Sequence, residues 1–501
     1  MRIVHLSSEF APIAKAGGLG EVIIGLSRKL VRLGNFVEVI IPKYNFIDSN
    51  KLNNLEVDLP DFKCLGHSNT MWKAGVEGCA LHLLEDHHPA KYFQRDEIYG
   101  FDDDIARFTY FSRAALEYLR LKNEPIDVLH LHDWHVSLCA PLVKDLFKDL
   151  MVKSVVLSIH NLEYQGKCAV HDLDLIGMNG AEYLRAERLM DENPNFPHSI
   201  NLLKGGIVYS DAVIPVSPSY AKEILLPEFS FGLQSTLKKA AHKTRGILNG
   251  IDTTIWDPSK DKSLVSTYSL ETVTKGKQKN RESFDLDLHK RPWVGAVTRL
   301  VPQKGPDLII EAIEKTIELG GTFLLLGSSP IAEIQEQFNQ VQKKYQGNPQ
   351  VLLNYNYDDQ LAHLIYGALD LLLVPSRFEP CGLTQLIAMR YGTVPIVRST
   401  GGLKDTVFDC DDPSVAVEKR NGFTFADFTK KSMCSALERA FHLFRTDPTS
   451  FHTLIRRGMQ SDFSWKKPAL EYQKIYAQTS MKSKAPQKTL KERIDRLADT
   501  A

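Results

Sequence analysis

One short segment combines a carboxylate with the start of a helix. In residues 375–385, Pro-Ser-Arg-Phe-Glu-Pro-Cys-Gly-Leu-Thr-Gln, Glu379 follows an apolar run at 369–375 and precedes a helical pattern at 383–391. The run predicts a buried strand, and α/β folds bind ligands at the carboxyl ends of their strands. Unpaired amides at a helix start favour an anion. The segment therefore offers an acidic group and a phosphate cradle, although an acidic turn before an ordinary helix has the same pattern.

Two cations occupy a comparable position earlier in the chain. Arg299 and Lys304 flank a loop between a predicted strand that begins at 293 and a predicted helix at 307–319. Arginine offers a planar fork and lysine a compact charge, so the pair can hold a diphosphate. A solvated loop is the alternative interpretation.

A glycine-rich loop near the beginning of the chain carries a third cation. Lys15 precedes Gly17 and Gly18 in the sequence Lys-Ala-Gly-Gly-Leu-Gly, between a predicted strand at 2–7 and a predicted helix at 21–33. Glycine lets a ligand approach the backbone, and the lysine can neutralise a phosphate. The loop matches neither a P-loop nor the GxGxxG dinucleotide pattern. A flexible turn with a solvated lysine remains possible.

Polar side chains end a predicted strand that begins at Asp127. They are His130, His132, Asp133 and His135. Because side chains alternate along a strand, His130 and His132 share one face and Asp133 points to the other, which argues against a common metal. A hydrogen-bonded strand end and a sugar-binding wall remain open.

A second predicted strand, at 155–161, ends in His160 and Asn161, an imidazole and an amide suited to carbohydrate hydroxyls. A buried histidine of purely structural role is the alternative for His160.

Strands and helices alternate in two sets along the chain. The second set begins at Trp293, after a polar and charged stretch at 257–291. The pattern predicts an α/β fold with two Rossmann-like, doubly wound domains facing each other across a cleft. The predicted parts are residues 1–245 (first domain), 246–460 (second domain), 461–478 (a helix that packs back near the first domain) and 479–501 (a polar, basic tail).

The overall composition disfavours several classes of partner. Lys+Arg and Asp+Glu number 61 each, so no excess charge favours nucleic acid or an anionic membrane. The first strand begins at residue 2, leaving no room for a signal peptide, and no apolar run approaches the ~20 residues of a membrane span. The seven cysteines include no CxxC pair, as expected for free thiols in a reducing compartment. We therefore expect a cytoplasmic protein with a small or neutral ligand.

Seven motifs in this sequence resemble those of one enzyme family. They are KAGGLGEV, HLHDWH, SIHNLEYQG, LNGID, TRLVPQKG, PSRFEPCGLTQL and STGGLKDTV. Their wording and order are similar to the bacterial glycogen synthase and plant starch synthase family, retaining glucosyltransferases of the two-Rossmann-domain (GT-B) type. The resemblance implies that ADP-glucose donates glucose to the non-reducing end of an α-1,4-glucan. It also implies that the first domain holds the acceptor and the second the nucleotide sugar.

The resemblance further implies roles for individual residues. Arg299 and Lys304 would bind the diphosphate, with Lys15, Gly17 and Gly18 near its phosphates. The remaining implied roles are Glu379 against the transferred glucose, Cys381, Gly382, Leu383 and Thr384 on sugar hydroxyls and a phosphate oxygen, Tyr357 on the adenine, His160 near the reacting sugar, Asn249 on sugar hydroxyls, and Asp133 on the acceptor side. The implied catalytic residues are Glu379, Lys304, Arg299, Lys15 and His160.

Two positions differ from the residues that are usual in the family's motifs. Ala16 stands where threonine is common, and Glu21 where aspartate is common. Ala16 removes a hydroxyl without touching Lys15 or the glycines, and Glu21 keeps its charge one methylene further out. These departures bear on nucleotide preference and affinity more than on catalysis.

The implied reaction breaks the bond between the anomeric carbon and a phosphate oxygen, so negative charge develops on the diphosphate. Cations aimed at that group stabilise the transition state more than the ground state, and no metal or other cofactor is then expected. Retention implies same-face attack, with a covalent intermediate on Glu379 as the alternative. A two-domain transferase that uses UDP-glucose or another acceptor, and a glucan-binding protein without activity, are the competing interpretations.

Overall fold

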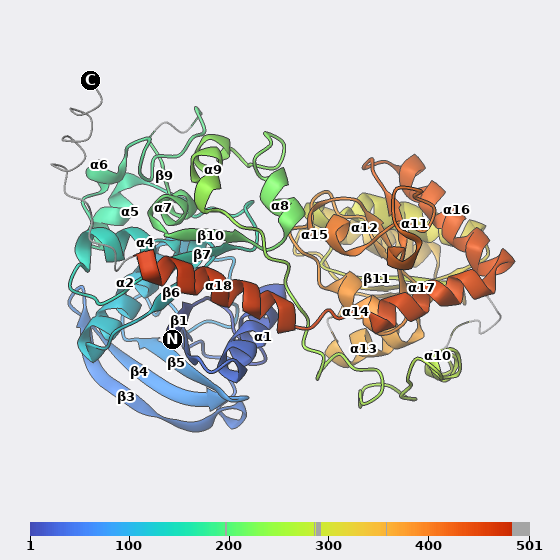
Figure 1. The fold of residues 1–501 in the computed structure, drawn as a ribbon, viewed down its shortest axis with the longest axis horizontal. Coiled ribbons are helices and arrows are strands. Elements are labelled where there is room, and N and C mark those ends of the chain that lie inside the picture. The colour runs from blue at the N-terminus through green and yellow to red at the C-terminus, as the bar shows by residue number, and fades with distance from the viewer. Residues whose placement is uncertain (196–197, 285, 287–291, 357, 483–501) are drawn as a thin grey trace. The chain divides into compact units, whose positions relative to one another are not determined.

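The computed structural model describes residues 1–482, except 196–197, 285, 287–291 and 357. The chain forms two compact units, here called the first and second domains (Figure 1). The first domain comprises Met1–Ile214, Ser230–Arg245 and the described residues from Lys466 onward, and the second comprises Pro215–Phe229 and Gly246–Trp465. The chain thus enters the second domain at 215, ahead of the predicted boundary at 245, and returns to the first domain for residues 230–245.

A sheet of eight strands forms the centre of the first domain. Its strands are β1 Arg2–Leu6, β2 Phe36–Pro42, β3 Asn53–Cys64, β4 His67–Val76, β5 Cys79–Asp86, β6 Val128–His132, β7 Val155–Ile159 and β10 Ala212–Pro215, in the order β10-β7-β6-β1-β2-β5-β4-β3. β1 pairs in parallel with both β2 and β6, and β3 and β4 extend one edge as antiparallel strands. Apart from that pair, the order is that of a doubly wound sheet whose direction of winding reverses between β1 and β6.

Helices and short elements cover this sheet and connect its strands. They are α1 Gly18–Arg32, α2 Asp104–Lys122, α3 Trp134–Ser137, α4 Cys139–Pro141, α5 Val170–Leu175, α6 Gly180–Tyr183, α7 Leu202–Tyr209, α9 Gln234–Ala240, α18 Lys466–Lys482, the short pair β8 Lys167–Cys168 and β9 Ile200–Asn201, the 3₁₀ turns Ser49–Lys51 and Ala241–Lys243, and a π turn at Leu142–Leu146. α1 buries Leu19, Val22, Ile23, Leu26 and Leu30, an apolar stripe at helical spacing. The stripe explains why this segment is helical.

The final described helix, α18, belongs to the first domain. It contacts α1, and Figure 1 shows it in red beside that helix. The side chains of Tyr472 and Tyr476 are fully buried, and the Tyr476 hydroxyl lies 2.8 Å from Nδ1 of His130 on β6. The Tyr472 hydroxyl lies 3.3 Å from Oγ of Ser158 on β7. The helix continues to Lys482, four residues beyond the end predicted at 478.

The second domain contains a six-stranded sheet in which every neighbouring pair is parallel. Its strands are β11 Trp293–Val297, β12 Thr322–Leu326, β13 Val351–Asn354, β14 Leu371–Val374, β15 Val394–Arg398 and β16 Phe423–Phe425, in the order β13-β12-β11-β14-β15-β16. Its helices are α8 Pro218–Glu223, α10 Val273–Arg281, α11 Pro306–Glu318, α12 Ala332–Lys344, α13 Asp359–Ala368, α14 Thr384–Arg390, α15 Gly401–Thr406, α16 Lys430–Thr446 and α17 Pro448–Gln460, with 3₁₀ turns at Pro302–Lys304 and Val417–Lys419. The strand order reverses between β11 and β14. The prediction of Rossmann-like domains is confirmed.

The second-domain sheet is buried on both faces, as parallel sheets usually are. Along β14, Leu371 and Leu373 pack in the core that contains α11 and α16, whereas Leu372 and Val374 pack in the core that contains α13 and α14. Successive side chains point to opposite faces of a strand, so a continuous apolar run supplies both cores. This run was the feature that predicted the strand.

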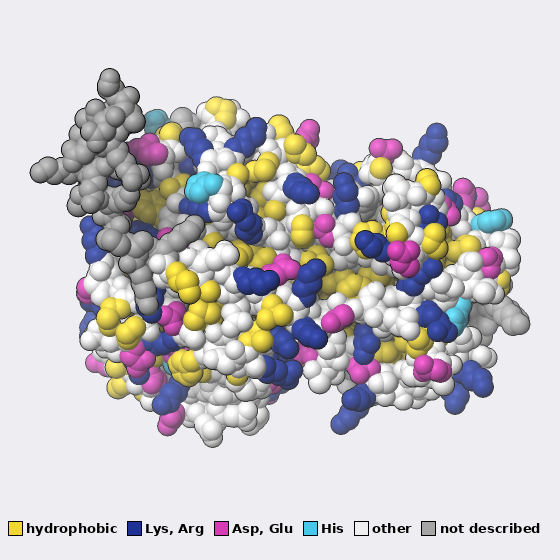
Figure 2. All heavy atoms as spheres, viewed as in Figure 1, with side chains coloured by type: hydrophobic (Ala, Val, Ile, Leu, Met, Phe, Trp, Pro, Cys, Tyr) yellow, Lys and Arg dark blue, Asp and Glu magenta, His cyan; other side chains and the backbone are white. Residues whose placement is uncertain are grey.

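The surface of the chain agrees with its balanced composition. On the face shown in Figure 2, basic and acidic side chains are interspersed. Among the described residues, none of the helices has both the length and the apolar character that a membrane span requires.

Replacing Tyr476 by phenylalanine tests how firmly α18 docks. The change removes the buried partner of His130 Nδ1, and an unsatisfied buried polar atom costs about 1–3 kcal/mol. We expect a lower midpoint of urea unfolding, followed by circular dichroism. Tyr92→Phe is the matched control, because its hydroxyl makes no hydrogen bond with a described residue and its loss costs within about 0.5 kcal/mol. Equal midpoints for the two variants would show that the hydrogen bond between Tyr476 and His130 does not stabilise the docked helix.

Candidate active site

The switch point of the second domain brings two predicted loops together. β11 and β14 are neighbours, with Val294 opposite Leu371 and Gly295 opposite Leu372. The loops that follow them, at 298–305 and 375–383, therefore leave the same edge of the sheet. Ligands of doubly wound folds bind outside the carboxyl ends of strands at this reversal of strand order.

A cation and a carboxylate meet at this edge. Lys304 Nζ lies 2.7 Å from Glu379 Oε2, and the Ser376 hydroxyl donates to the same oxygen at 2.8 Å. Glu379 is buried, with 5% of its surface exposed. Oε1 of Glu379 makes no hydrogen bond with a described residue. The structure thus brings Lys304 and Glu379 into contact and leaves the second carboxylate oxygen of Glu379 without a hydrogen bond to a described residue.

Arg299 and the residues that lead into α14 lie on the same two loops as this pair. Arg299 is exposed on the loop after β11, and its guanidinium forms no ion pair with a described residue. The residues before and at the start of α14, Gly382, Leu383 and Thr384, are partly exposed. Gly382 has a φ of 72°, a conformation that favours glycine. These groups are thus at least partly exposed and available to a ligand.

Asn249 lies against Cys381 in the second domain. The backbone of Asn249 hydrogen-bonds to the Cys381 thiol, and burial raises the pKa of that thiol to about 12. The side-chain oxygen Oδ1 of Asn249 is buried and has no hydrogen-bond partner among the described residues. A buried amide oxygen without a partner is unusual in a folded protein, so this atom suits a ligand hydroxyl.

The second glycine-rich motif, Ser399–Leu403, supports the Glu379 loop. The Gly402 amide donates to the Glu379 carbonyl at 3.0 Å. A Cβ at Gly401 would lie 1.9 Å from that carbonyl oxygen, and one at Gly402 would lie 2.1 Å from the Cys381 carbonyl oxygen. Only glycine fits this close approach of two backbones. The carboxylate of Glu223 in α8 accepts from the Gly401 amide at 2.8 Å.

In the first domain, a carboxylate already occupies the glycine-rich loop. Oε2 of Glu9 accepts from the amides of Ala16 at 2.9 Å and Gly17 at 3.0 Å. Oε1 of Glu9 accepts from the Tyr99 hydroxyl at 2.9 Å. α1 begins at Gly18, three residues earlier than predicted. The Gly17 amide therefore binds an internal carboxylate. Lys15 is the other group by which this loop can bind an anion.

Lys15 forms an ion pair with Glu21, one of the two positions at which this sequence differs from the residues usual in the family. Its Nζ lies 2.5 Å from Oε1 of Glu21, and both side chains are about a quarter exposed, at 28% and 25%. The ion pair holds the lysine over the first turn of α1. Ala16 contributes its amide to Glu9, a contact that does not depend on its side chain.

Asp133 and His160 form a unit at the switch point of the first domain. Asp133 follows β6 with a φ of 59°, and its Oδ1 accepts from the amides of His160 at 2.7 Å and Asn161 at 3.3 Å. Burial raises the pKa of Asp133 to about 7, although the two amides favour the carboxylate. Because both amides bind Oδ1, Oδ2 can carry the proton. Asp133 thus holds the turn that presents His160 and Asn161.

The other histidines of the polar cluster lie inside the domain. His130 and His132 are completely buried, with ring centroids 4.1 Å apart, as strand alternation predicts for residues on one face. The ring of His135 packs against Tyr99 and Phe108. None of the three is exposed enough to form a sugar-binding wall directly. Tyr357, predicted to stack on the adenine, lies outside the described residues.

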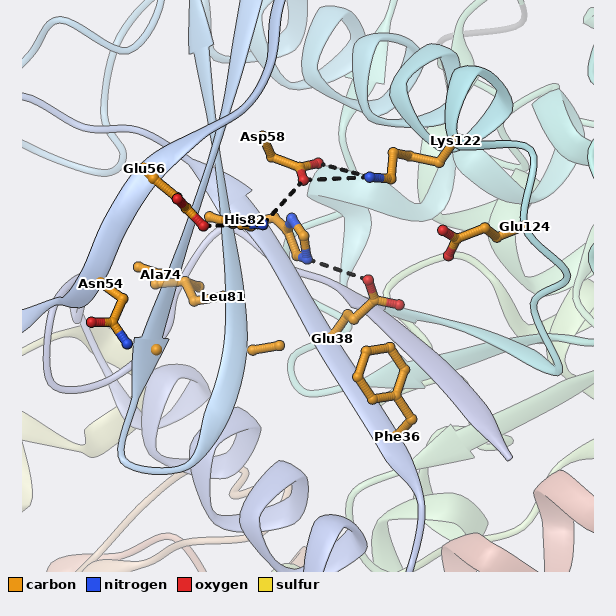
Figure 3. A pocket seen from close by; sticks show the side chains of 13 residues that line it. Phe36, Glu38, Asn54, Glu56, Asp58, Ala74, Leu81, His82, Lys122 and Glu124 are labelled. Carbon is orange, nitrogen blue, oxygen red and sulfur yellow. Dashed lines mark hydrogen bonds and ion pairs between the residues drawn. The ribbon is translucent and has the colours of Figure 1, made fainter.

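A separate pocket of about 350 Å³ lies on strands β2–β5 (Figure 3). Its charged groups pair with one another: Lys122 Nζ lies 3.3 Å from Asp58, and His82 Nε2 lies 3.3 Å from Glu38. No predicted site residue lines it. The mutual pairing leaves few polar groups for a ligand.

Sequence reasoning missed three residues that shape the loops. Glu9 lies just after β1, at the same carboxyl edge as Asp133, so its place at a strand end was a usable signal. Ser376 lies beside Glu379 and could have been included for the same reason. Glu223 is 178 residues from Gly401 in the sequence, and no local pattern connects them.

The fold and site define a class of protein. Two Rossmann-like domains, one with a cation and a carboxylate at its switch point, are those of a GT-B glycosyltransferase. The structure of sucrose-phosphate synthase from Thermosynechococcus elongatus shares this fold, with a TM-score of 0.60 at 20% identity over 95% of this chain and 98% of that one. Residues 2–239 match the family model described as starch synthase catalytic domain, and residues 278–442 match glycosyl transferases group 1.

The chain belongs to the glycogen synthase and starch synthase family of glucosyltransferases. It is 45% identical to a glycogen synthase of Protochlamydia amoebophila, over 96% of this chain and all of that protein. It is 41% identical to a probable starch synthase 4 of Arabidopsis thaliana, over 96% of this chain and 47% of that one. The catalytic domain of Arabidopsis thaliana starch synthase IV, bound to ADP and acarbose, matches with a TM-score of 0.92 at 41% identity, over 96% and 99% of the two chains. The resemblance drawn from the seven motifs is confirmed.

Replacing Gly402 by alanine tests how the second glycine-rich motif supports Glu379. The new Cβ would collide with the Cys381 carbonyl and displace the Glu379 loop, so we expect a loss of about 1–3 kcal/mol in stability and lower turnover. Gly75→Ala is the control, because its Cβ would make only an ordinary 3.6 Å contact. Calorimetric unfolding measures the difference. Equal transitions in both variants would show that the loop tolerates the added methyl.

The raised pKa of Asp133 makes stability depend on pH. Between pH ~4 and ~7 the folded protein keeps the proton that the unfolded chain loses, so stability falls as pH rises through this window. Asp133→Asn removes this dependence while keeping an oxygen for the two amides. Between pH 5 and 8 we expect the free energy of unfolding of the wild type, measured in urea, to fall by about 2 kcal/mol relative to that of the variant. Parallel pH profiles would mean that the two amides keep the group ionised.

Proposed function

We propose that this protein is a glycogen synthase that transfers glucose from ADP-glucose to the non-reducing end of an α-1,4-glucan with retained anomeric configuration. The observation that carries the proposal is the contact between Lys304 Nζ and Glu379 Oε2, 2.7 Å long, at the switch point of the second domain. Relatives named glycogen synthase and a related catalytic domain bound to ADP and acarbose support the donor and acceptor.

Arg299 and Lys304 are assigned to the diphosphate of the donor. An ammonium group has three donors, so Lys304 can keep its bond to Glu379 while binding a phosphate oxygen. Arg299 is exposed on the same loop and offers a planar fork. Both charges stabilise the negative charge that develops as the glycosidic bond to phosphate breaks. Lys15 is assigned as a further cation for the phosphates, near Gly17 and Gly18.

Glu379 is assigned to sugar binding. Oε2 is held by Lys304 and Ser376, and Oε1 is left for a sugar hydroxyl. A carboxylate neutralised by a lysine is a weaker nucleophile, which favours same-face attack over a covalent intermediate. The unpartnered Oδ1 of Asn249 suits a further hydroxyl. The segment Cys381–Thr384 would bind hydroxyls and a phosphate oxygen through its backbone amides.

The acceptor is assigned to the first domain. Asp133, His160 and Asn161 are joined by hydrogen bonds at the end of β6 and β7, where an imidazole and an amide suit carbohydrate hydroxyls. The family resemblance supports the same assignment, and Tyr357 is assigned to the adenine on the same ground. We further propose that the reaction needs no metal or other cofactor and takes place in the cytoplasm, in keeping with seven cysteines that form no disulfide.

Glucan extension by purified protein tests the proposal. A short maltooligosaccharide is mixed with ADP-glucose or UDP-glucose in the presence of EDTA, and product lengths are followed. We expect a ladder of single glucose additions with ADP-glucose. Lys304→Ala should lower turnover by roughly 100-fold, the scale of losing one charge-stabilising group. Lys344→Ala removes an exposed lysine paired with Glu314 and should leave turnover unchanged.

Three results would count against this proposal. The absence of a ladder from folded protein that still binds glucan would favour a binding protein. A Lys304→Ala variant within about threefold of wild type would remove this lysine from the charge-stabilising role. A glucosyl adduct trapped on Glu379 would replace same-face attack by a covalent mechanism.

A further inference from the structure

Three histidines form a row of hydrogen bonds across neighbouring strands of the first domain. His5 lies on β1, His132 ends β6, and His160 follows β7. Nδ1 of His5 lies 2.9 Å from Nε2 of His132, and Nδ1 of His132 lies 3.0 Å from Nε2 of His160. His5 and His132 are completely buried, whereas His160 is partly exposed. The row therefore runs from the interior of the sheet to the edge where a sugar is proposed to bind.

The same region could be mistaken for a metal site. Ring nitrogens of His5, His130 and His132 lie within 4.8 Å of one another. A metal ligand, however, needs a free lone pair directed at the ion. Both nitrogens of His132 face other imidazoles, and those of His130 lie 2.8 Å from the Ser158 and Tyr476 hydroxyls. The observed contacts are those of a hydrogen-bond network, which a metal would have to break.

The protons of the three rings are interdependent. Burial lowers the pKa of His5 and His160 to about 3 and that of His132 well below its usual value, so all three are neutral near pH 7. A neutral imidazole has one donor and one acceptor nitrogen. The proton position on one ring therefore sets the position on the next, and only two consistent arrangements exist.

The buried end of the row favours one arrangement. Nε2 of His5 is buried without a partner in the part of the chain that the structure describes. A buried N–H without an acceptor is rarer than an acceptor without a donor, so His5 carries its proton on Nδ1. His5 then donates to His132, and His132 donates from Nδ1 to Nε2 of His160. His160 is left with its proton on Nδ1, a nitrogen that makes no hydrogen bond with a described residue.

We propose that His5 and His132 are positioning residues that hold His160 in the Nδ1–H tautomer, so that it presents a proton donor to an oxygen of the bound sugar. This inference rests on the proposed function, which places a sugar at His160. His5 lies two hydrogen bonds away from His160 and acts only through His132.

The tautomer of His160 can be observed directly. Full-length protein labelled with ¹⁵N in its imidazoles is examined by long-range ¹H–¹⁵N correlation, with His160 assigned by the loss of its signals in His160→Gln. In the wild type we expect a single Nδ1–H tautomer of His160. In His5→Phe, which removes the first donor, we expect a mixture of both tautomers and a roughly tenfold lower kcat/KM for glucan extension, the lower end of the loss when an orienting partner of a functional imidazole is removed.

Two variants separate proton placement from structural damage. His5→Asn keeps an N–H near the position of Nδ1 and should restore the single tautomer and most of the activity. His135→Phe makes the same chemical change at another buried histidine of the domain, outside the row, and should leave the His160 signals unchanged.

An Nε2–H tautomer in the wild type would overturn the inference, and this result requires no variant to fold. His160 signals that are unaffected in folded His5→Phe would also overturn it. If the wild-type protein extends glucan while His160 is in the Nε2–H form, the proposed function holds and the proposed role of His5 and His132 is wrong. Wild-type protein that shows the His5-dependent tautomer but transfers no glucose contradicts the proposed function instead.

Discussion

The ion pair between Lys304 and Glu379 depends on the order of strands in the second domain. The two residues are 75 positions apart in the sequence. They meet because β11 and β14 are neighbours, so the loops after both strands leave the same edge of the sheet. Gly305, with a φ of 68°, lets the Pro375 carbonyl approach to where a Cβ would lie 2.5 Å away. Gly401 and Gly402 allow a similarly close approach to the carbonyl oxygens of Glu379 and Cys381. The backbone segments around the ion pair thus pack closer together than any residue larger than glycine would allow at these three positions.

In both domains the carboxylate of a glutamate accepts hydrogen bonds from backbone amides at the glycine-rich start of a helix. Glu9 accepts amides of the loop before α1, and Glu223 accepts the Gly401 amide at the start of α15. Unpaired amides at a helix start attract an anion, and an internal carboxylate meets this requirement without a ligand. The loops therefore have a defined shape in the free protein. A phosphate approaching the first loop would meet Lys15 rather than the Gly17 amide.

The charge of the site is arranged by pairing. Lys304 neutralises Glu379, Lys15 pairs with Glu21, and Arg299 is exposed on the loop after β11. Asp133 is different, because burial raises its pKa and two amides bind one of its oxygens. The carboxyl groups of the two domains are thus suited to different tasks: a paired carboxylate beside the proposed donor, and a buried group that holds a turn on the proposed acceptor side.

Much of the fold followed from local patterns, because apolar periodicity is a property of adjacent residues. The run at 369–375 predicted β14, the repeat at 307–319 predicted α11, and the seven motifs identified the family. Residue type and spacing alone also singled out Lys304 and Glu379 as chemical groups. Tertiary structure decided which distant groups meet: Glu223 with Gly401, Tyr476 with His130, and His5 with His132. These contacts depend on strand order and on where the chain returns to each domain. The sequence determines such features only through the complete fold, because no local pattern records which strands become neighbours.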